Sequence, residues 1–208
     1  MKQAVIVFQR TPEHGKVKTR LAVDIGEEDA LRVYKFLLRH THRVLESLSA
    51  DIHVFVTGAC SDDSSSPPPN YYFHRQQGID LGARMNAAFV KVLTLGYERV
   101  MIIGTDCYEL SSEILRQAFV ELAHKDLVIG PAQDGGYYLL GLTKPTPHLF
   151  TEIPWSTSSV CSDTLRRAKE LGLTCGLLPV LRDVDTAEDL GVLRQLLDLG
   201  KKITNFEK

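Results

Sequence analysis

The chain has 208 residues, of which 44% are hydrophobic and 24% charged, which excludes an intrinsically disordered protein and fits one globular domain over residues 1–208. Its formal net charge of −2 excludes broad electrostatic attraction to nucleic acid or to an anionic membrane, so a bound phosphate needs a local site. The four cysteines form no CxxC pair and no apolar run reaches the length of a membrane span, so we expect a cytoplasmic protein with reduced thiols.

The predicted elements begin with residues 3–8, a continuous apolar run that is typical of a strand buried on both faces of a parallel sheet. After a polar loop, residues 27–48 carry apolar side chains at helical spacing with acidic residues at the start, which predicts an amphipathic helix. Residues 59–69 are small, polar and proline-rich and predict a mobile surface loop. The remaining predicted strands are 51–57, 71–74, 99–104, 126–130, 137–142 and 174–178, and the remaining predicted helices are 81–95, 111–123, 162–171 and 186–199.

Strands that alternate with helices predict an α/β fold with a mostly parallel sheet and helices on both faces. In such a sheet, ligands bind in the crevice outside the carboxyl ends of the strands. The loops of this chain that are richest in charge and glycine directly follow predicted strands. We therefore expect a binding site at this edge of the sheet.

The first of these loops, residues 9–22, surrounds one glycine, Gly15, with the cationic side chains Arg10, Lys16, Lys18 and Arg20. Glycine allows a ligand to approach the backbone closely, lysine supplies a point charge, and arginine can bind two phosphate oxygens at once. This chemistry suits a diphosphate, and a solvated basic loop is the alternative interpretation. The loop matches neither GxxxxGK[ST] nor GxGxxG, which disfavours an ATPase and a dinucleotide-dependent dehydrogenase.

A second loop follows the predicted strand 99–104 with the sequence Gly-Thr-Asp. Asp106 lies at the end of this buried strand, where a carboxylate can hold a hard cation, and the preceding Thr105 is a candidate nucleotide contact. Mg²⁺ keeps several waters and needs only one or two carboxylates besides substrate phosphates, so one aspartate suffices. Asp106 could instead cap the next helix, but Ser111 and Ser112 are better placed for that role.

Three further aspartates follow later predicted strands. Asp134 precedes two glycines and is placed to contact an acceptor or a metal, whereas Asp-Gly-Gly is also a common hairpin turn. Asp183 and Asp185 precede the last predicted helix, so one of them can complete a metal site with Asp106. Alternatively, Asp185 or Thr186 simply caps that helix.

Two less specific segments complete the candidate site. Residues 76–86 are a glycine-rich start of a helix, in which Asp80 is a candidate N-cap and Arg84 and Asn86 are candidate contacts to a base or ribose. Trp155, the only tryptophan, can stack on an acceptor or fill the core, and we favour the core. The chain has no HExxH motif and no GxSxG elbow, which argues against the common zinc proteases and serine hydrolases.

Taken together, the segments TPEHGKVKTRLA, QGIDLGARM, GTDCYEL, PAQDGGYYLLGL, IPWST and DVDTAEDL resemble a bacterial GT-A-fold family of unknown function that is described as glycosyltransferase-like. The resemblance covers nearly the whole chain in the family's order. It implies a three-layer α/β/α, Rossmann-like sandwich with a mostly parallel, mixed sheet, of the nucleotide-diphospho-sugar transferase type.

The same pattern is similar to small nucleotidyltransferases, including the guanylyltransferases of molybdenum-cofactor and deazaflavin-cofactor synthesis. Their lysine-bearing first loop resembles residues 18–21 here, and their late Asp-Val-Asp-Thr resembles residues 183–186. The chain departs from the usual family form at Tyr108, where proline is common, and at Gln133, where an acidic residue is common. The change at Gln133 removes a carboxylate, which affects the expected donor or acceptor preference.

We expect an enzyme that transfers a glycosyl group from a nucleotide-diphospho-sugar to a small acceptor. Lys18 and Arg20 would hold the phosphates, and Mg²⁺ or Mn²⁺ on Asp106 would neutralise the leaving diphosphate. Asp134 would orient or deprotonate the acceptor hydroxyl. The alternative is a nucleotidyltransferase that joins a nucleoside triphosphate to a phosphorylated acceptor and releases pyrophosphate. A non-catalytic nucleotide-binding protein is less favoured.

These expectations assign each candidate residue a role. The predicted catalytic residues are Asp106, Asp134 and Lys18, and the predicted metal ligands are Asp106, Asp183 and Asp185. The predicted nucleotide-binding residues are Arg10, Gly15, Lys16, Lys18, Arg20, Asp80, Arg84, Asn86 and Thr105. Expected partners are the nucleotide donor and a small-molecule acceptor, with a homodimer left open, and neither nucleic acid nor a membrane.

Overall fold

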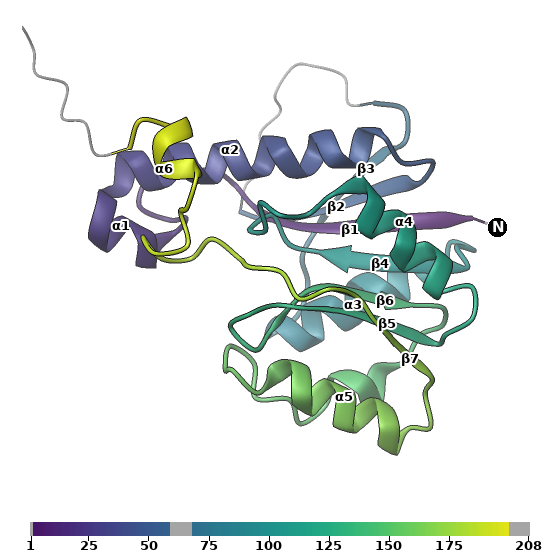
Figure 1. Ribbon diagram of the computed structural model, residues 1–208. Helices are drawn as coiled ribbons and strands as arrows, with labels where there is room; N and C mark the ends of the chain where they lie inside the picture. The colour runs from purple at the N-terminus through teal and green to yellow at the C-terminus, as the bar shows by residue number, and fades with distance from the viewer. Residues whose placement is uncertain (1, 59–67, 200–208) are drawn as a thin grey trace, which may run out of the picture.

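The computed structural model describes residues 2–58 and 68–199, which form an α/β sandwich around one sheet (Figure 1). The predicted loop at 59–69 lies largely outside the described residues. The strands are β1 (Gln3–Arg10), β2 (Asp51–Thr57), β3 (Tyr71–Arg75), β4 (Arg99–Ile103), β5 (Leu127–Pro131), β6 (Tyr137–Leu142) and β7 (Cys175–Leu177). In the described part of the chain, these seven strands are ordered β3-β2-β1-β4-β6-β5-β7.

Strand β6 runs antiparallel to both of its neighbours, β4 and β5. All other neighbouring pairs in this sheet are parallel. The expected α/β fold with a mostly parallel, mixed sheet is therefore confirmed. Because β6 is reversed, its first residue lies at the same edge of the sheet as the last residue of β4, next to the ends of the parallel strands.

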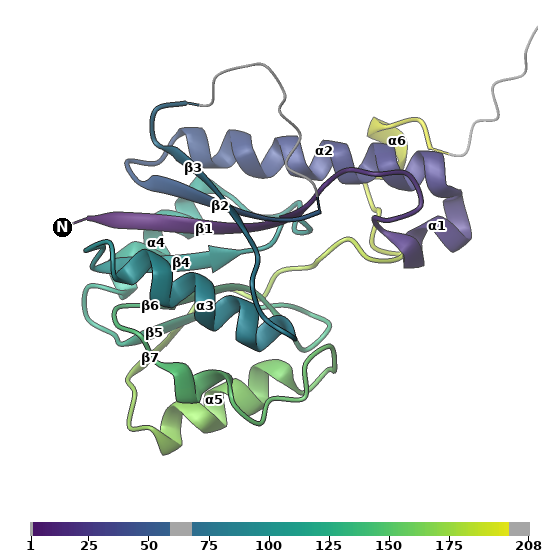
Figure 2. The same ribbon diagram turned by 180° about the vertical axis from the view of Figure 1, so that it is seen from behind.

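Helices cover both faces of the sheet. They are α1 (Thr19–Ile25), α2 (Glu27–Glu46), α3 (Leu81–Leu93), α4 (Ser112–Glu121), α5 (Val160–Glu170) and α6 (Leu193–Leu196), with a 3₁₀ turn η1 (Pro147–Phe150). The two opposite views show α2 and α4 on one face and α3 and α5 on the other (Figure 1, Figure 2). Val5 and Val7 of β1 pack into one core, and Ala4 and Ile6 into the other. Residues 4–8 are continuously apolar, and residues 4–7 are buried, as expected for a strand that is covered on both faces.

Two helices begin at the side-chain caps that the sequence indicates. Asp80 accepts a hydrogen bond from the backbone N–H of Ala83 (2.7 Å), and Ser111 accepts one from that of Ile114 (3.4 Å). Each of these bonds satisfies an N–H group that has no partner within its helix. The start of α3 is thereby fixed beside the carboxyl edge of the sheet.

Two predicted segments differ from the structure. Residues 19–22, the end of the predicted loop 9–22, instead begin α1, because Leu21 is buried in a small cluster with residues of α2 and of the C-terminal segment. The predicted helix 186–199 is wrong over most of its length, since only α6 is helical there. Gly191 has a φ of 45°, outside helical geometry, so the chain turns there before the short helix α6 begins.

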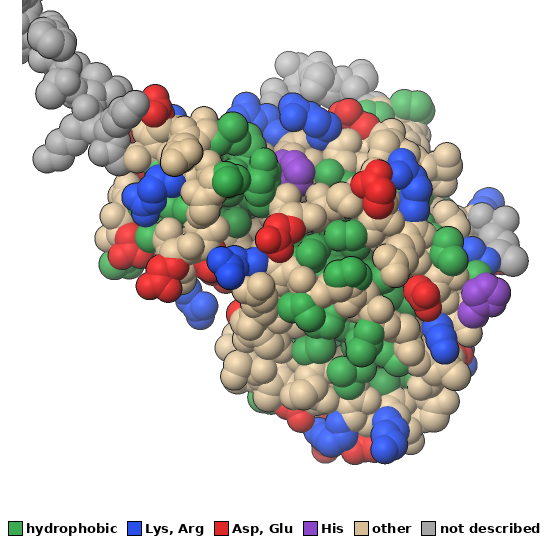
Figure 3. Space-filling model, in the orientation of Figure 1, with side chains coloured by type: hydrophobic (Ala, Val, Ile, Leu, Met, Phe, Trp, Pro, Cys, Tyr) green, Lys and Arg blue, Asp and Glu red, His purple; other side chains and the backbone are tan. Residues whose placement is uncertain are grey.

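The surface carries mixed charge on the face that Figure 1 presents. Figure 3 shows its acidic and basic side chains scattered among one another, with hydrophobic side chains gathered below α4, over β5, β6 and β7. This face offers no broad basic area of the kind that binds nucleic acid. Within residues 2–58 and 68–199, no helix has both the length and the apolar character needed to cross a membrane.

His53 of β2 is a buried histidine next to the edge strand β3. It is 1% exposed, and its Nδ1 lies 3.0 Å from Nε2 of His74 in β3. Tyr72 stacks on its ring, and Tyr97 meets it edge-on. Burial, followed by the charges of His74 and Lys91, lowers the pKa of His53 to about 4, although Asp51 acts in the opposite direction. The folded protein therefore holds this imidazole neutral at neutral pH.

We predict that the protein becomes less stable as pH falls from about 6.5 towards 4, because the unfolded chain protonates this histidine before the folded chain does. Between pH 7 and pH 4.5 the expected contribution is a loss of roughly 2 kcal/mol from the free energy of unfolding. His53→Phe keeps the ring packing and should flatten this part of the pH dependence, as measured by urea unfolding. Identical pH profiles for the two proteins would contradict the prediction.

Candidate active site

A cleft of about 930 Å³ lies at the carboxyl ends of β1 and β4. It is bounded by the β1–α1 loop, the start of α3, the turn before β6, and the segments 155–160 and 183–185. Its volume is in the range of small-molecule sites. The predicted site residues that line it are Arg10, Lys18, Arg20, Arg84, Thr105, Asp106, Asp134, Asp183 and Asp185. Side chains from distant parts of the chain therefore meet at the expected edge of the sheet.

Lys18 joins two of these segments. Its Nζ lies 2.6 Å from Oδ1 of Asp106, at the end of β4, and 3.0 Å from Oδ1 of Asp185. The lysine side chain is only 4% exposed, whereas the two carboxylates are 43% and 41% exposed. Lys18 has a φ of 49°, a left-handed conformation that is unusual for a residue other than glycine. This backbone geometry at the start of α1 is a strained feature of the kind that concentrates at functional sites.

The Lys18 amine keeps its positive charge despite its burial. Burial on its own would lower its pKa, but the negative charges of Asp106 and Asp185 and the hydrogen bonds to them raise the pKa above its ordinary value. An ammonium held in this way is a fixed positive charge at the base of an open cleft. It faces the two carboxylates through their buried sides, while their exposed sides face solvent.

A third aspartate, Asp183, lies near the same charged group. Burial, as the largest cause, and then the charges of Asp106, Asp134 and Asp185 raise the pKa of Asp183 to about 7, although Lys18 acts to lower it. The neighbouring carboxylates therefore add to the effect of burial in disfavouring the ionised form of Asp183. A cation bound among these groups would relieve the repulsion.

Residues 181–185 reach the site as an extended segment that crosses the ends of the strands. Leu181 donates a backbone hydrogen bond to the carbonyl of Pro131 (3.1 Å), and Val184 donates one to the carbonyl of Asp106 (2.9 Å). The side chain of Val184 then packs in the small cluster with Leu21 of α1. The segment is therefore fixed both to the sheet and to the helix that follows Lys18, and this places Asp183 and Asp185.

Tyr34 is a site residue that the sequence did not reveal. Its hydroxyl donates to the carbonyl oxygen of Arg10 (2.8 Å) and accepts from the N–H of Arg10 (2.9 Å), and its side chain lines the cleft. Burial raises the pKa of Tyr34, while hydrogen bonds to Arg10 and Thr105 act against this rise. Tyr34 thus fixes the end of β1, from which Arg10 extends. Its position on the apolar side of α2 gave no signal of this role.

Asp134 lies in the turn between β5 and β6, where its Oδ1 accepts a hydrogen bond from the N–H of Gly136 (2.8 Å). The hairpin-turn interpretation is therefore correct. The same residue also lines the cleft, and its expected contact with an acceptor or a metal stays a prediction.

Four predicted nucleotide contacts lie outside the lining of the cleft, namely Gly15, Lys16, Asp80 and Asn86. Lys16 forms an ion pair with Glu13 on the surface, and Asp80 serves as the N-cap of α3. Arg10 and Arg20 lie on the cleft and form no ion pair with another described residue. Arg84 also lines the cleft, where its Nε donates to the carbonyl of Gly78 (3.1 Å).

The two residues that depart from the usual family pattern, Tyr108 and Gln133, lie away from the charged part of the cleft. Gln133 accepts a hydrogen bond from Nε of Arg182 (2.9 Å), and it is not a lining residue. Tyr108 packs against the rings of Phe36 and His40. The carboxylates that line the cleft are therefore present despite the change at position 133.

The residues present fit a hard cation that is bound together with phosphate. Asp106, Asp183 and Asp185 offer the oxygen ligands that Mg²⁺ prefers, and the repulsion among their negative charges favours a cation. Over the described residues, no three His, Cys, Asp or Glu side chains are already grouped as a metal site. A cation that completes its shell with water and phosphate oxygens suits this arrangement better than one enclosed by protein ligands alone.

The fold and the cleft define an α/β protein of the nucleotide-diphospho-sugar transferase type. The chain belongs to the bacterial family DUF2064, described as uncharacterized proteins conserved in bacteria, whose model matches residues 40–157. Its structure is similar to that of a candidate nucleotide-diphospho-sugar transferase from Desulfovibrio desulfuricans G20, with a TM-score of 0.86. The two sequences are 35% identical over 97% of this chain and 90% of that chain. Among curated proteins, no sequence matches the chain.

More distant structures share the fold alone. The inositol-1-phosphate CTP transferase from T. maritima has a TM-score of 0.61 at 13% identity, covering 95% of each chain. The 4-diphosphocytidyl-2C-methyl-D-erythritol synthase from Anaerococcus prevotii DSM 20548 has a TM-score of 0.61 at 11% identity, covering 95% of this chain and 96% of that chain. The architecture is therefore one that transferases use, within a family whose reaction is uncharacterised.

We predict that Lys18→Met weakens the binding of a nucleoside diphosphate by about 1–3 kcal/mol, since a charge-assisted contact is lost while the side-chain packing is kept. The same change should tighten the binding of Mn²⁺ alone, because Asp106 and Asp185 no longer share their charge with an ammonium. Calorimetric titration measures both affinities. Lys144→Met, at an exposed ion pair with Asp126, is the matched control and should change neither. Unchanged nucleotide affinity in Lys18→Met would remove this lysine from the phosphate site.

Proposed function

We propose that the chain is a metal-dependent transferase that moves a glycosyl group from a nucleotide-diphospho-sugar to a small acceptor. The observation that carries this proposal is the Lys18 ammonium held between Asp106 and Asp185 at the base of a cleft. A fixed positive charge and partly exposed carboxylates in one cleft suit a diphosphate bound with a divalent cation. The similarity to the Desulfovibrio protein supports this reaction class.

The basic residues of the β1–α1 loop would bind the diphosphate. Lys18 is buried and fixed, so it can act without losing side-chain freedom on binding. Arg10 and Arg20 lie at the rim, where each guanidinium can bind two phosphate oxygens. Positive charge at these three positions would stabilise the leaving diphosphate, because negative charge develops on the diphosphate oxygens as the bond to the sugar breaks.

Asp106, with Asp183 or Asp185, would hold Mg²⁺ or Mn²⁺. When bound, this cation would neutralise charge on the leaving diphosphate. Asp106 is the best placed of the three, since it follows the central strand β4 and its backbone carbonyl is fixed by Val184. Its Oδ1 is engaged by Lys18, and its side chain is 43% exposed and lines the cleft.

Asp134 would orient the acceptor hydroxyl and take its proton. In this step, the acceptor oxygen forms a bond to the anomeric carbon, and the bond between that carbon and the diphosphate oxygen breaks. The proton passes to Asp134, and the nucleoside diphosphate leaves. The turn of residues 132–136 fixes this carboxylate, since its Oδ1 is bonded to the N–H of Gly136.

The second candidate is nucleotidyl transfer from a nucleoside triphosphate to a phosphorylated acceptor. The similarity of the fold to two cytidylyl-transferring enzymes favours it. The same basic loop would then hold a triphosphate, and pyrophosphate would leave. The two reactions differ in product, because glycosyl transfer releases a nucleoside diphosphate and nucleotidyl transfer releases pyrophosphate.

We predict that the protein with Mg²⁺ or Mn²⁺ consumes a nucleotide-diphospho-sugar when a panel of these donors is offered with mixed small-molecule acceptors. The measurement is release of nucleoside diphosphate, with pyrophosphate release from the four nucleoside triphosphates assayed in parallel. Pyrophosphate release alone would replace the first candidate with the second. Nucleotide binding without any turnover would favour a non-catalytic binding protein instead.

We predict that Asp106→Asn leaves the fold intact and abolishes metal-dependent nucleotide binding, since an amide oxygen carries no charge for the cation. Calorimetry with Mn²⁺ and nucleotide measures the loss, and circular dichroism checks the fold. Asp163→Asn is the matched control, because Asp163 is on α5 and is bonded to the exposed Arg166. Equal metal affinity in Asp106→Asn and the parent protein would exclude Asp106 as a ligand.

A further inference from the structure

The cleft lining includes a group of large apolar side chains, and one of them is the chain's only tryptophan. Trp155 is half-buried and lines the cleft with Leu81 and Met85 of α3 and Tyr137 of β6. The interpretation of Trp155 as a core residue is therefore only half correct, since it packs against the core and also borders the site. The chemistry of this apolar group differs from that of the charged group around Lys18.

Two glycines make room for the segment that carries Trp155. A Cβ on Gly82, in the first turn of α3, would lie 2.4–2.5 Å from three atoms of the indole. A Cβ on Gly135, in the turn before β6, would lie 1.9 Å from the carbonyl oxygen of Ser158. The indole and the Ser158 carbonyl leave no room for a Cβ, so only glycine fits at positions 82 and 135. The segment is thus wedged between α3 and the turn that carries Asp134.

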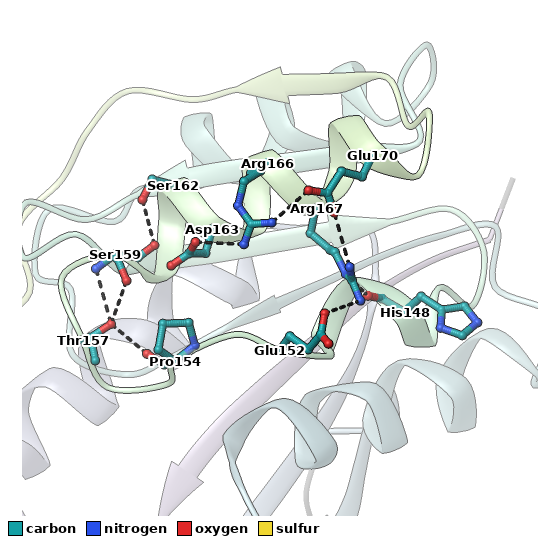
Figure 4. Close-up of polar contacts among 10 residues, drawn as sticks. All are labelled: His148, Glu152, Pro154, Thr157, Ser159, Ser162, Asp163, Arg166, Arg167 and Glu170. Carbon is teal, nitrogen blue, oxygen red and sulfur yellow. Dashed lines mark hydrogen bonds and ion pairs between the residues drawn. The ribbon is translucent and has the colours of Figure 1, made fainter.

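Hydrogen bonds and ion pairs brace the segment from α5 (Figure 4). Arg167 donates to the carbonyl of His148 (3.1 Å) and to Oγ1 of Thr151 (2.7 Å), and it pairs with Glu152 (3.2 Å). Next to Trp155 in sequence, the hydroxyl of Thr157 donates to the carbonyl of Pro154 (2.7 Å) and closes the turn that contains the tryptophan. These contacts hold the chain on both sides of the tryptophan.

The backbone around Trp155 is strained. Glu152 has a φ of 60° and Ser156 a φ of 66°, both in the left-handed region that residues with a side chain rarely adopt. Such conformations cost on the order of 1–3 kcal/mol each and persist where the surroundings enforce them, most often at binding sites. A loop that only filled the core would need neither the strain nor a position on the cleft.

The order of the strands places Trp155 beyond the phosphates. The basic loop follows β1, Asp106 follows β4, and Asp134 precedes β6, which is the next strand in the sheet. Trp155 lies against Gly82 of α3, and Ser158 of the same segment lies against Gly135 in the Asp134 turn, so this segment borders the β6 side of the cleft. A ligand whose diphosphate lies at Lys18 therefore reaches Trp155 with the group attached to its phosphates.

We propose that Trp155 is the stacking platform of a sugar subsite, on which a hydroxylated ring lies with its apolar C–H face against the indole. Aromatic side chains bind large apolar surfaces, and the hydroxyls of Ser156 and Ser158, which also line the cleft, can bond to the polar edge of the ring. Asp134 then lies beside the same ring. This inference rests on the proposed function for its role in transfer, but the subsite itself can be tested without turnover.

Because Trp155 is the only tryptophan, fluorescence excited at its absorption edge reports on this subsite alone. The nucleotide probes are UDP, GDP and CDP, the same diphosphates carrying glucose or mannose, and the parent nucleosides. Free hexoses at millimolar concentration are tested separately. All titrations contain Mg²⁺ and no Mn²⁺, because Mn²⁺ quenches fluorescence. We expect a saturable change in emission with a sugar-bearing nucleotide or a free hexose, and none with the matching diphosphate or nucleoside. A response to free hexose would identify an acceptor sugar, and a response only to the conjugate would identify the donor sugar.

Binding to variants provides a second readout. Trp155→Ala should weaken binding of the responding sugar ligand by about tenfold, the equivalent of one stacking contact, with no change for the matching diphosphate. Trp155→Phe should restore most of the affinity because it keeps a ring. Tyr72→Ala, at the far edge of the sheet, is the control for removal of an aromatic ring and should leave the affinity unchanged.

The outcomes separate this inference from the proposed reaction. If nucleosides alone change the emission and sugars add nothing, the indole binds a base and the sugar subsite is overturned. If neither hexoses nor sugar nucleotides change it, the inference is overturned even when calorimetry detects nucleotide binding. If free hexoses change it and no nucleotide binds, the subsite stands and the proposed nucleotide-dependent function fails.

Discussion

The contact on which the site depends is that of the Lys18 ammonium with Asp106 and Asp185. It links the loop after β1, the end of β4 and the extended segment 181–185, none of which are neighbours in sequence. Removing an amine from water is costly, and a buried ion pair seldom adds net stability over an apolar replacement. Its retention in a left-handed backbone position is therefore better explained by ligand binding than by stability. The carboxylates clustered around it point to the same conclusion.

The architecture could be predicted from the sequence because its signals are local or periodic. The buried strands β1, β2 and β4 are short apolar runs, and α2 carries a continuous apolar stripe. The mixed character of the sheet was expected only from family resemblance, and the sequence did not indicate that β6 is the reversed strand. The C-terminal segment failed as a helix prediction because Gly191 takes a positive φ of 45°, which interrupts helical geometry in the middle of the predicted span. A count of apolar positions does not reveal this interruption.

The candidate site could be predicted in composition but not in arrangement. Charged loops after strands indicated Lys18, Asp106 and Asp185, and the structure brings all three together. The sequence did not separate Lys16, which pairs with Glu13 on the surface, from Lys18, because burial depends on α1 and on the distant segment 181–185. Tyr34 escaped notice for a related reason. Its hydroxyl bonds the backbone of Arg10, and a contact between side chain and distant backbone leaves no sequence pattern.

The cleft combines a charged group around Lys18 with large apolar side chains around Trp155, and this combination bears on which transfer it would perform. Glycosyl and nucleotidyl transfer both need phosphates near Lys18, so the charged group does not distinguish them. They differ in the position of the reacting atom, since glycosyl transfer places it in the ring beyond the diphosphate, towards β6. A braced wall that fixes this ring beside Asp134 would supply the orientation that the reaction needs before it starts, and such orientation accounts for a large share of catalytic rate. Strain at Glu152 and Ser156 is then stored on the side of the cleft where glycosyl transfer would use it.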